Sequence, residues 1–469
     1  MRRLLSSFSG ISEISPRCEV GAPRRVLCSV ATNPALVAHL YRRAGFGALP
    51  AELDELSQHS WTDLVDNLLA GLSGPDHAGD AVPLPHLTSI PESNVPGYQF
   101  NGWEEYNNLI SWWLERMIVT STPLREKLTL LLHCQFPTSW SKVGWAYMMY
   151  VQNQIFRTLG PGNFETLVQA VAKDPAMLIW LDAGTSHRND PNQNFARELM
   201  ERFTMGAGNY TQEDVVQSAR CFTGWELDNV SGQFFFNPYD NDDGIKRFLG
   251  RTGRFTGEDI ISIVCNEPAG HRWVISRLWS WLAYPITPNA PIVQDFVHGY
   301  SKDLNITNLL GAMFNHPAFV SPRAVNGLVK QPVELLVGAL RVLGLTTGPF
   351  SPGQLAGQLG NIGQVPFTPP TVGGWGSNQY WQSTGAAAGY IQQAYSLAGI
   401  ANLTALENGD GHPAAQVTAA LSLIGLPKVS DRTHAALISL ATSLRTNNGS
   451  WPAQQLVTLA LLSPEFAMN

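Results

Sequence analysis

The sequence predicts a mainly α-helical, multi-helical globular protein that carries one small β-hairpin and consists of two packed helical subdomains. Helix-start signals recur along the whole chain, a clear strand pattern is confined to one short stretch, and 469 residues exceed the size that one core usually serves. A composition of 44% hydrophobic and 14% charged residues allows a large core. A loop rich in Gly and Pro follows residue 284, so we place the N-terminal subdomain at 31–284 and the C-terminal subdomain at 285–469.

The helices are predicted from their start signals, in chain order. An Asn, Ser or Thr that can accept from free first-turn N–H groups precedes each of the first predicted helices. These helices are 35–44, 61–70, 124–133, a polar helix discussed below, and the helix that Thr211 begins and Gly224 ends. Later helices are predicted to start near residues 256, 268, 331, 351, 380 and 431.

The strand signal lies at 232–236, where the sequence reads Gly-Gln-Phe-Phe-Phe. Aromatic residues favour strands, and the Ser231–Gly232 pair is typical of a hairpin turn. We therefore expect residues 225–229 to pair with 232–236 as a short hairpin.

The charge pattern and the hydropathy pattern exclude two classes of partner. The formal net charge is -7 and the 30 Lys and Arg residues form no basic block, which argues against nucleic acid. A membrane span needs roughly 20 consecutive apolar residues, and the sequence contains no such stretch. We expect a soluble protein without a membrane span.

The cysteines and the N-terminus predict a cytoplasmic setting. The five cysteines show no Cys-x-x-Cys spacing, which favours reduced, mostly buried thiols over a zinc site or a redox pair. Residues 1–30 lack the apolar run of a secretory signal, although relatives often look exported. We expect this stretch to be a disordered or misannotated leader.

The most informative segment is a polar run from Asp190 to about Met205. Asp190 is predicted to cap a helix that glycines stop just after Met205. Glu198 and Glu201 lie three residues apart and project from nearly one face, with Arg197 in reach of Glu201. This set is more polar than a packing helix needs. We therefore expect the helix to form a site at the centre of the fold, with Arg197 and Glu198 mostly buried.

Candidate ligand-binding residues accompany this helix. Asn192 and Asn194 supply amides next to Arg197. Trp225 and Trp375 follow glycines in polar loops, where a large amphipathic ring is often available to a ligand. Such a set suits a small-molecule or glycan ligand.

Two shorter polar segments complete the candidate site. His133 and Gln135 end a predicted helix, and we expect them, together with Asp242 and Trp375, to line one cleft with the polar helix. Asp240 and Asp242 lie in an acidic turn whose alternating oxygens make them candidate ligands of calcium or magnesium. The sequence has no phosphate loop and no dinucleotide motif, so no nucleotide cofactor is expected.

The motifs of this chain resemble the signature of the bacterial domain of unknown function 1800 family. Members of that family resemble Asn-Glu-Asn-Phe/Tyr-Ala-Arg-Glu-Leu, then Tyr-Thr-x-x-Asp-Val, then Ala-Arg-x-x-Thr-Gly-Trp. The resemblance spans nearly the whole chain from about residue 40, at 42–47, 125–133, 192–201, 210–214, 219–225, 244–250, 330–334, 367–375 and 462–466. The family has no agreed function, so the resemblance implies no activity.

The resemblance also implies that this member lacks two histidines. Relatives look like Trp-His-x-His-Phe where this chain has His133 and Gln135, and like His-Asp-x-Gly where it has Asn241 and Asp242. Amides keep hydrogen-bonding capacity, but they do not replace imidazole as ligands of transition metals. We therefore expect no stoichiometric zinc, iron or copper.

Three functions are open on the sequence. The first is a hydrolase of a polar organic or carbohydrate ligand, with Glu198, Glu201 and His133 as catalytic groups. The second is a metal-dependent enzyme whose histidine and carboxylate site is degenerate here. The third is a non-catalytic binding or assembly protein. In that case the two glutamates only pair with neighbouring arginines, His133 is a core residue, and 240–244 is a solvated turn.

Overall fold

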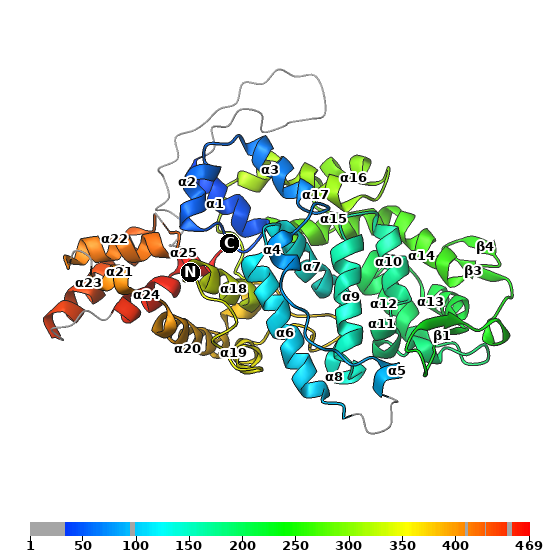
Figure 1. The fold of residues 1–469 in the computed structure, drawn as a ribbon. Helices are drawn as coiled ribbons and strands as arrows, with labels where there is room; N and C mark the ends of the chain where they lie inside the picture. The colour runs from blue at the N-terminus through cyan, green and yellow to red at the C-terminus, as the bar shows by residue number, and fades with distance from the viewer. Residues whose placement is uncertain (1–32, 94–98, 409–410, 427, 448–452) are drawn as a thin grey trace, which may run out of the picture.

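We describe the protein from a computed structural model, which describes residues 33–93, 99–408, 411–426, 428–447 and 453–469. The leader predicted at residues 1–30 lies outside the described residues. Figure 1 shows an elongated molecule in which the small sheets and α13 lie at one end and the helices α20 to α24 at the other. The helices α6, α7, α9 and α18 run through the middle (Figure 1).

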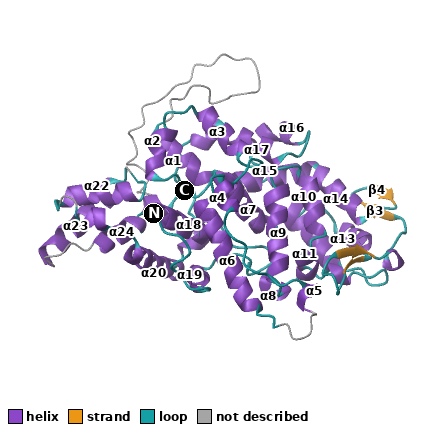
Figure 2. Ribbon diagram, in the orientation of Figure 1, coloured by secondary structure: helices purple, strands orange, loops and turns teal. Residues whose placement is uncertain are grey.

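The predicted fold class is confirmed, because helices dominate the described chain (Figure 2). The first half contains α1 (Pro34–Arg43), α2 (Pro50–Leu56), α3 (Trp61–Ala70), α4 (His77–Asp80), α5 (Ile90–Ser93), α6 (Gly102–Val119), α7 (Pro123–Gln135), α8 (Trp140–Val143), α9 (Ala146–Leu159), α10 (Phe164–Ala172), α11 (Pro175–Trp180), α12 (Gln193–Glu198) and α13 (Gln212–Ala219). The second half contains α14 (Gly257–Asn266), α15 (Pro268–Leu282), α16 (Gln294–Tyr300), α17 (Ile306–Phe314), α18 (Pro332–Val342), α19 (Gln354–Ile362), α20 (Thr384–Ile400), α21 (Thr404–Glu407), α22 (Pro413–Leu423), α23 (Asp431–Asn447), α24 (Ala453–Leu461) and α25 (Pro464–Ala467). Among these residues no helix is both long and apolar enough to cross a membrane.

Capping chemistry explains where these helices begin. The side chain of Asn33 caps α1, that of Ser60 caps α3, and Thr211 and Thr256 open α13 and α14 with capping boxes. These starts agree with the predictions. Two others shift: α19 begins after Gly353, and the start predicted near residue 380 is a 3-10 turn that precedes α20.

The predicted hairpin is confirmed. The strands β1 (Trp225–Leu227) and β2 (Phe234–Phe236) pair antiparallel, with Trp225 opposite Phe236. A second hairpin, β3 (Lys246–Phe248) with β4 (Arg251–Gly253), was not predicted. Its two-residue turn, Leu249–Gly250, has φ of 45° and 77°, the left-handed backbone of a type I′ turn, and lacks the usual Asn-Gly or Asp-Gly signal.

Two clusters of buried apolar side chains fill the described interior. The first joins α1, α3, α10 and α11 to α14, α15, α16 and α17, and the second joins α6 to α18, α19, α20, α22 and α24. Side chains of α7 and α9 belong to both clusters and therefore connect them. The division of the chain at residue 284 stays a prediction.

A buried charged group, the Glu126 network, joins α6, α7 and α9. Glu126 is fully buried and accepts from Arg157 Nε and Nη2 at 2.8 Å each, from Trp113 Nε1 at 2.9 Å and from Arg116 Nε at 3.4 Å. Burial alone would raise the pKa of the Glu126 carboxyl, but the two guanidinium groups and the indole N–H outweigh it and lower that pKa. The network is satisfied on both carboxylate oxygens.

Candidate functional site

The polar helix changes its winding at its second half. The α-helix α12 ends at Glu198 and continues as a π-helix over Leu199–Thr204. The prediction of one regular α-helix to Met205 is therefore wrong beyond residue 198. The predicted cap is also wrong, because Asn192 Oδ1 accepts from the backbone N–H of Asn194 at 2.9 Å where Asp190 was expected. A π-helical turn within a helix is frequent at functional sites.

Contacts from other elements hold the end of this π-helix. Gln135 Nε2 donates to the carbonyl oxygens of Arg202 at 3.1 Å and Phe203 at 2.9 Å, and Trp273 Nε1 donates to the carbonyl of Arg202 at 3.1 Å. Gly206 ends the segment with a φ of 81°, and a Cβ there would lie 2.6 Å from the Trp273 ring. Only glycine fits both demands.

Glu198 lies on the inner side of this segment. The residue is 9% exposed, and its Oε2 is buried without a hydrogen-bond partner among the described atoms. The nearest cation, Arg202 Nε, is 3.7 Å from that oxygen, beyond hydrogen-bonding distance. Burial raises the pKa of Glu198, and the charge of Arg202 only partly offsets this. Glu198 therefore holds its proton more tightly than an ordinary glutamate.

Glu201 lies further along the same segment and is half-buried. Its Oε2 accepts from the Tyr210 hydroxyl at 2.9 Å, and its Oε1 lies 3.5 Å from Arg202 Nη2. Burial and this hydrogen bond raise the pKa of Tyr210 to about 12. Arg202 thus lies between the two carboxylates without a short bond to either.

A pocket opens beside Glu201. It has a volume of about 320 Å³, and its walls come from the π-helix end, from the start of α15 and from the loop after α15. Its lining residues are Glu201, Arg202, Met205, Gly206, Ala207, Asn209, Ala269, Arg272, Trp273, Pro288 and Asn289. Glu201 is the one residue of the predicted site that lines it.

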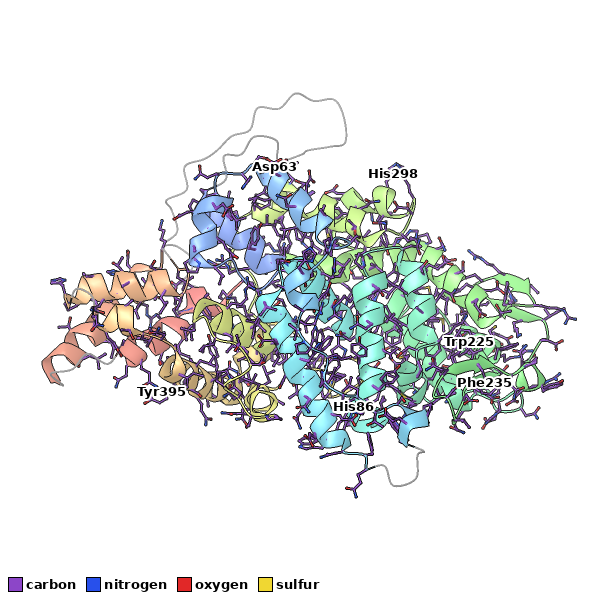
Figure 3. The ribbon with its side chains drawn as sticks, in the orientation of Figure 1. Asp63, His86, Trp225, Phe235, His298 and Tyr395 are labelled. Atoms are coloured by element: carbon purple, nitrogen blue, oxygen red, sulfur yellow. The ribbon has the colours of Figure 1, made fainter. Side chains whose placement is uncertain are left out.

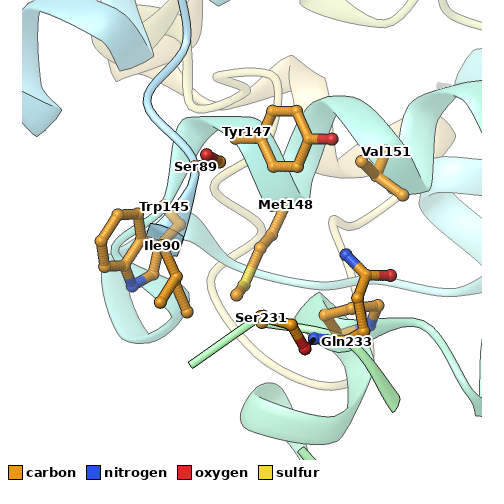
Figure 4. A pocket seen from close by; sticks show the side chains of 10 residues that line it. Ser89, Ile90, Trp145, Tyr147, Met148, Val151, Ser231 and Gln233 are labelled. Carbon is orange, nitrogen blue, oxygen red and sulfur yellow. Dashed lines mark hydrogen bonds between the residues drawn. The ribbon is translucent and has the colours of Figure 1, made fainter. Parts of the chain in front are cut away.

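A second hollow, shown in Figure 4, lies between α9 and the β1–β2 hairpin. Its walls are mainly apolar and include Ile90, Trp145, Met148 and Val151. The space of about 20 Å³ suffices for one water molecule and not for an organic ligand. The pocket beside Glu201 is therefore the better candidate.

Arg197 and the two predicted amides serve neighbouring segments. Arg197 is less buried than Glu198 but, as expected, hydrogen-bonded, because its Nη2 donates to Gln212 Oε1 at 2.9 Å. Asn192 Nδ2 donates to the carbonyl of Asp182 at 2.8 Å, and Asn194 Nδ2 donates to a carbonyl at the end of α11 at 3.2 Å. These contacts hold the start of α12, and a ligand-binding role for the three residues stays a prediction.

His133 is enclosed by aromatic rings and is 1% exposed. Its Nε2 accepts from the backbone N–H of Phe367 at 2.9 Å, so the neutral ring carries its proton on Nδ1. Burial lowers the pKa of His133 to about 3. This environment favours the reading as a core histidine over a catalytic one.

Trp375 does approach the predicted cluster. Its half-buried ring meets the His133 ring edge-on at 5.3 Å between centroids. The same loop passes Arg202, because a Cβ built on Gly373 would lie 3.9 Å from Arg202 Nη1. The structure thus brings His133, Gln135 and Trp375 to the side of the π-helix segment.

Trp225 was predicted to be available to a ligand, and this is wrong. Trp225 is 2% exposed, and its ring packs against Phe222, Phe234 and the ammonium group of Lys173. In Figure 3 it is labelled near Phe235 of the hairpin. The hairpin that follows the glycine covers the ring, which removes it from solvent.

Asp240 and Asp242 each have a protein partner. Asp240 Oδ2 meets His187 Nδ1 at 2.5 Å, and Arg220 donates to Asp242 from Nε at 2.7 Å and from Nη2 at 3.2 Å. The second position where relatives look like histidine, Asn241, accepts from the Thr223 hydroxyl at 3.4 Å. Within the described ranges no group of three His, Cys, Asp or Glu residues could hold a metal ion.

Sequence reasoning missed the part of the pocket that α15 supplies. Arg272 and Trp273 lie about 70 positions after the π-helix and reach it through packing between helices. A signal was present, since Arg272 and Arg277 are the two charged residues of this helix and Trp273 is amphipathic.

The fold and the pocket define a mainly helical protein with a polar cavity at the end of a π-helix. The chain belongs to the family described as protein of unknown function DUF1800, whose family model matches residues 39–468. Neither a curated protein nor a solved structure matches the chain.

Proposed function

We propose that this protein binds a polar organic ligand in the pocket beside Glu201. The pocket carries the proposal: its volume of about 320 Å³ is at the small end of the range for small-molecule sites. Its lining combines one indole ring with a carboxylate, two guanidinium groups and two amides. An apolar face with a few converging polar groups is the usual composition of such a site.

The lining suits a ligand of the size of one sugar ring. Trp273 offers an indole whose orientation is fixed by its hydrogen bond to the π-helix. Glu201, Asn209 and Asn289 present groups that can bond hydroxyls. A flat ring beside hydroxyl-binding groups supports a carbohydrate or a similar hydroxylated ligand.

A blocked pocket tests this proposal. Ala207 lines the pocket and is exposed, so Ala207→Trp should fill the space without disturbing the core. We expect calorimetric titration with D-glucose, N-acetylglucosamine and D-glucuronate to detect at least one ligand for the wild type and none for Ala207→Trp. The matched control is Ala51→Trp on exposed α2 surface. Equal binding by the blocked variant would refute the pocket as the site.

A second candidate function is hydrolysis of the bound ligand, and the Glu198–Glu201 pair favours it. Burial raises the pKa of Glu198, so this residue favours its protonated form three residues before Glu201, the carboxylate that lines the pocket. Glu201 lines the pocket and can take a proton from an attacking water. Two neighbouring carboxylates in different environments are the usual basis of an acid and base pair.

Turnover of aryl glycosides tests the hydrolase. We expect Glu201→Gln to lower kcat by about 100-fold or more while ligand binding persists, as for loss of a general base. Glu213→Gln, an exposed glutamate of α13, is the control. Unchanged turnover in Glu201→Gln would exclude Glu201 as the general base. The proposal that the pocket binds a ligand would still stand.

A further inference from the structure

We infer that the ligand of this pocket carries an oxyanion, as the carboxylate of an acidic sugar does, and that Arg202 and Arg272 hold that group. The inference rests on the proposed function and narrows the class of ligand. It follows from the balance of charge around the pocket and from the donors that the protein leaves unused.

The pocket lining contains two cations and one carboxylate. Arg202 lies 3.7 Å from Glu198 and 3.5 Å from Glu201, so neither pair has the short geometry of a charge-assisted hydrogen bond. Arg272 forms no ion pair with a carboxylate of the described chain. Both guanidinium groups therefore keep N–H donors for a ligand.

A third cation, Arg277, lies on α15 one turn beyond the pocket. Its guanidinium lies 4.5 Å from the Trp281 ring centre and 5.9 Å from that of Trp273, and its Nε donates to Gln135 at 3.3 Å. Burial, with a smaller effect of the charge of Arg202, lowers the pKa of Arg277. Arg277 thus adds a third positive charge on the helix that forms one wall of the pocket, and positive charge favours an anion.

The lining supplies separate groups for an oxyanion and for hydroxyls. Arg202 comes from the π-helix and Arg272 from α15, so the pocket has an arginine in each of two walls. Asn209 Nδ2 donates to the carbonyls of Met205 and Gly206, so its Oδ1 is the group left to accept from a ligand hydroxyl. Arginine forks match carboxylate geometry with two parallel bonds.

Comparison of D-glucuronate with D-glucose tests the inference. The two sugars share the same ring, and D-glucuronate carries a carboxylate where D-glucose carries a hydroxymethyl group. We expect calorimetry to show D-glucuronate binding about tenfold tighter or more, the effect of a charge-assisted hydrogen bond. Raising the salt from about 50 mM to about 500 mM should reduce that preference.

Arginine variants locate the effect. Arg272→Gln should weaken D-glucuronate binding about tenfold or more and weaken D-glucose binding much less. Arg272→Lys should give an intermediate affinity for D-glucuronate because it keeps the charge without the fork. Arg254→Gln is the control, since Arg254 is an exposed arginine outside the pocket. Circular dichroism of each variant confirms that it is folded.

The outcomes separate this inference from the proposed function. Equal affinity for both sugars, lost in Ala207→Trp, would overturn the oxyanion and keep the pocket. If neither of these sugars nor N-acetylglucosamine binds, both the inference and the proposed function are overturned. Inorganic sulfate that binds as tightly as D-glucuronate and depends on Arg272 would support the oxyanion site and show that the sugar ring adds no affinity.

Discussion

The Glu126 network and the Glu198–Glu201 pair both place carboxylates beside arginines, with opposite results. Glu126 meets Arg157 through two bonds of 2.8 Å, and the pKa of its carboxyl is lowered. Glu198 lies 3.7 Å from Arg202, one of its oxygens has no hydrogen bond among the described residues, and its pKa is raised. The same residue types thus form a closed network in one place and an open one in the other.

The difference distinguishes a closed structural network from the open pair on which the proposed function rests. A buried polar network that is fully satisfied fixes the elements it joins, here α6, α7 and α9. A buried acceptor that is left without a partner lowers stability, and each such group calls for an explanation. Removing carboxylates from each cluster is therefore the direct test.

The largest expected effect is that of Glu126→Gln. The variant leaves Arg157 and Arg116 buried without their anion, and breaking a buried ion pair on one side costs about 3–5 kcal/mol. We expect the free energy of unfolding in urea to fall by this amount. Glu213→Gln, at an exposed position, should change it by less than about 0.5 kcal/mol. If Glu126→Gln lowers the free energy of unfolding by less than about 1 kcal/mol, the two clusters do not differ in the way described above.

Asp174 is a third buried carboxylate, and no cation pairs with it in the described part of the chain. It accepts from Gln152 Nε2 at 2.7 Å and Met177 N at 3.0 Å, and burial raises its pKa to about 7. The folded state therefore holds this proton more tightly than the unfolded state. Stability should fall as the pH rises from about 4 to about 7, and the loss should be complete above that.

Asp174→Asn should remove this pH dependence. We expect the variant to exceed the wild type by about 1–3 kcal/mol in unfolding free energy at about pH 8, and the advantage to shrink toward about pH 4. Urea titrations at several pH values measure it. An advantage that stays constant with pH would show that ionisation of Asp174 is not its cause.

The smallest expected effect is that of Glu198→Gln. Arg197 bonds to Gln212, so the variant does not leave it unpaired, and the amide mimics the protonated acid that burial favours. We expect stability within about 1 kcal/mol of the wild type, with any gain confined to pH values above the ordinary carboxyl pKa. A loss as large as that of Glu126→Gln would mean that Glu198 belongs to a closed network as well.

The helix starts could be predicted because their causes are local. Ser60 accepts from the N–H of Asp63, and Thr211 and Asp214 bond each other across the first turn of α13. Such contacts span three residues and are visible in the sequence. The start of α19 shifted because Gly353 takes a left-handed backbone, with a φ of 82°.

The site was predicted less well because packing decides it. Nothing in the sequence of 199–204 signals a π-helix, and the carbonyls at its end accept from Gln135 and Trp273, which come from α7 and α15. Trp225 and Trp375 both follow glycine. The hairpin covers Trp225, whereas Trp375 lies in another loop and is half-buried. The one or two residues next to each tryptophan in the sequence do not reveal this difference in exposure.

The π-helix makes the length of one segment informative. Met205 N reaches the carbonyl of Met200, five residues back, where an α-helix reaches four, so this turn holds one residue more than usual. Deleting a single residue between Leu199 and Thr204 would remove that extra residue and allow a regular α-helix to form. The number of residues between Phe195 and Gly206 is therefore as much a property of the pocket as its lining residues are, because it sets the backbone from which Arg202 reaches the pocket.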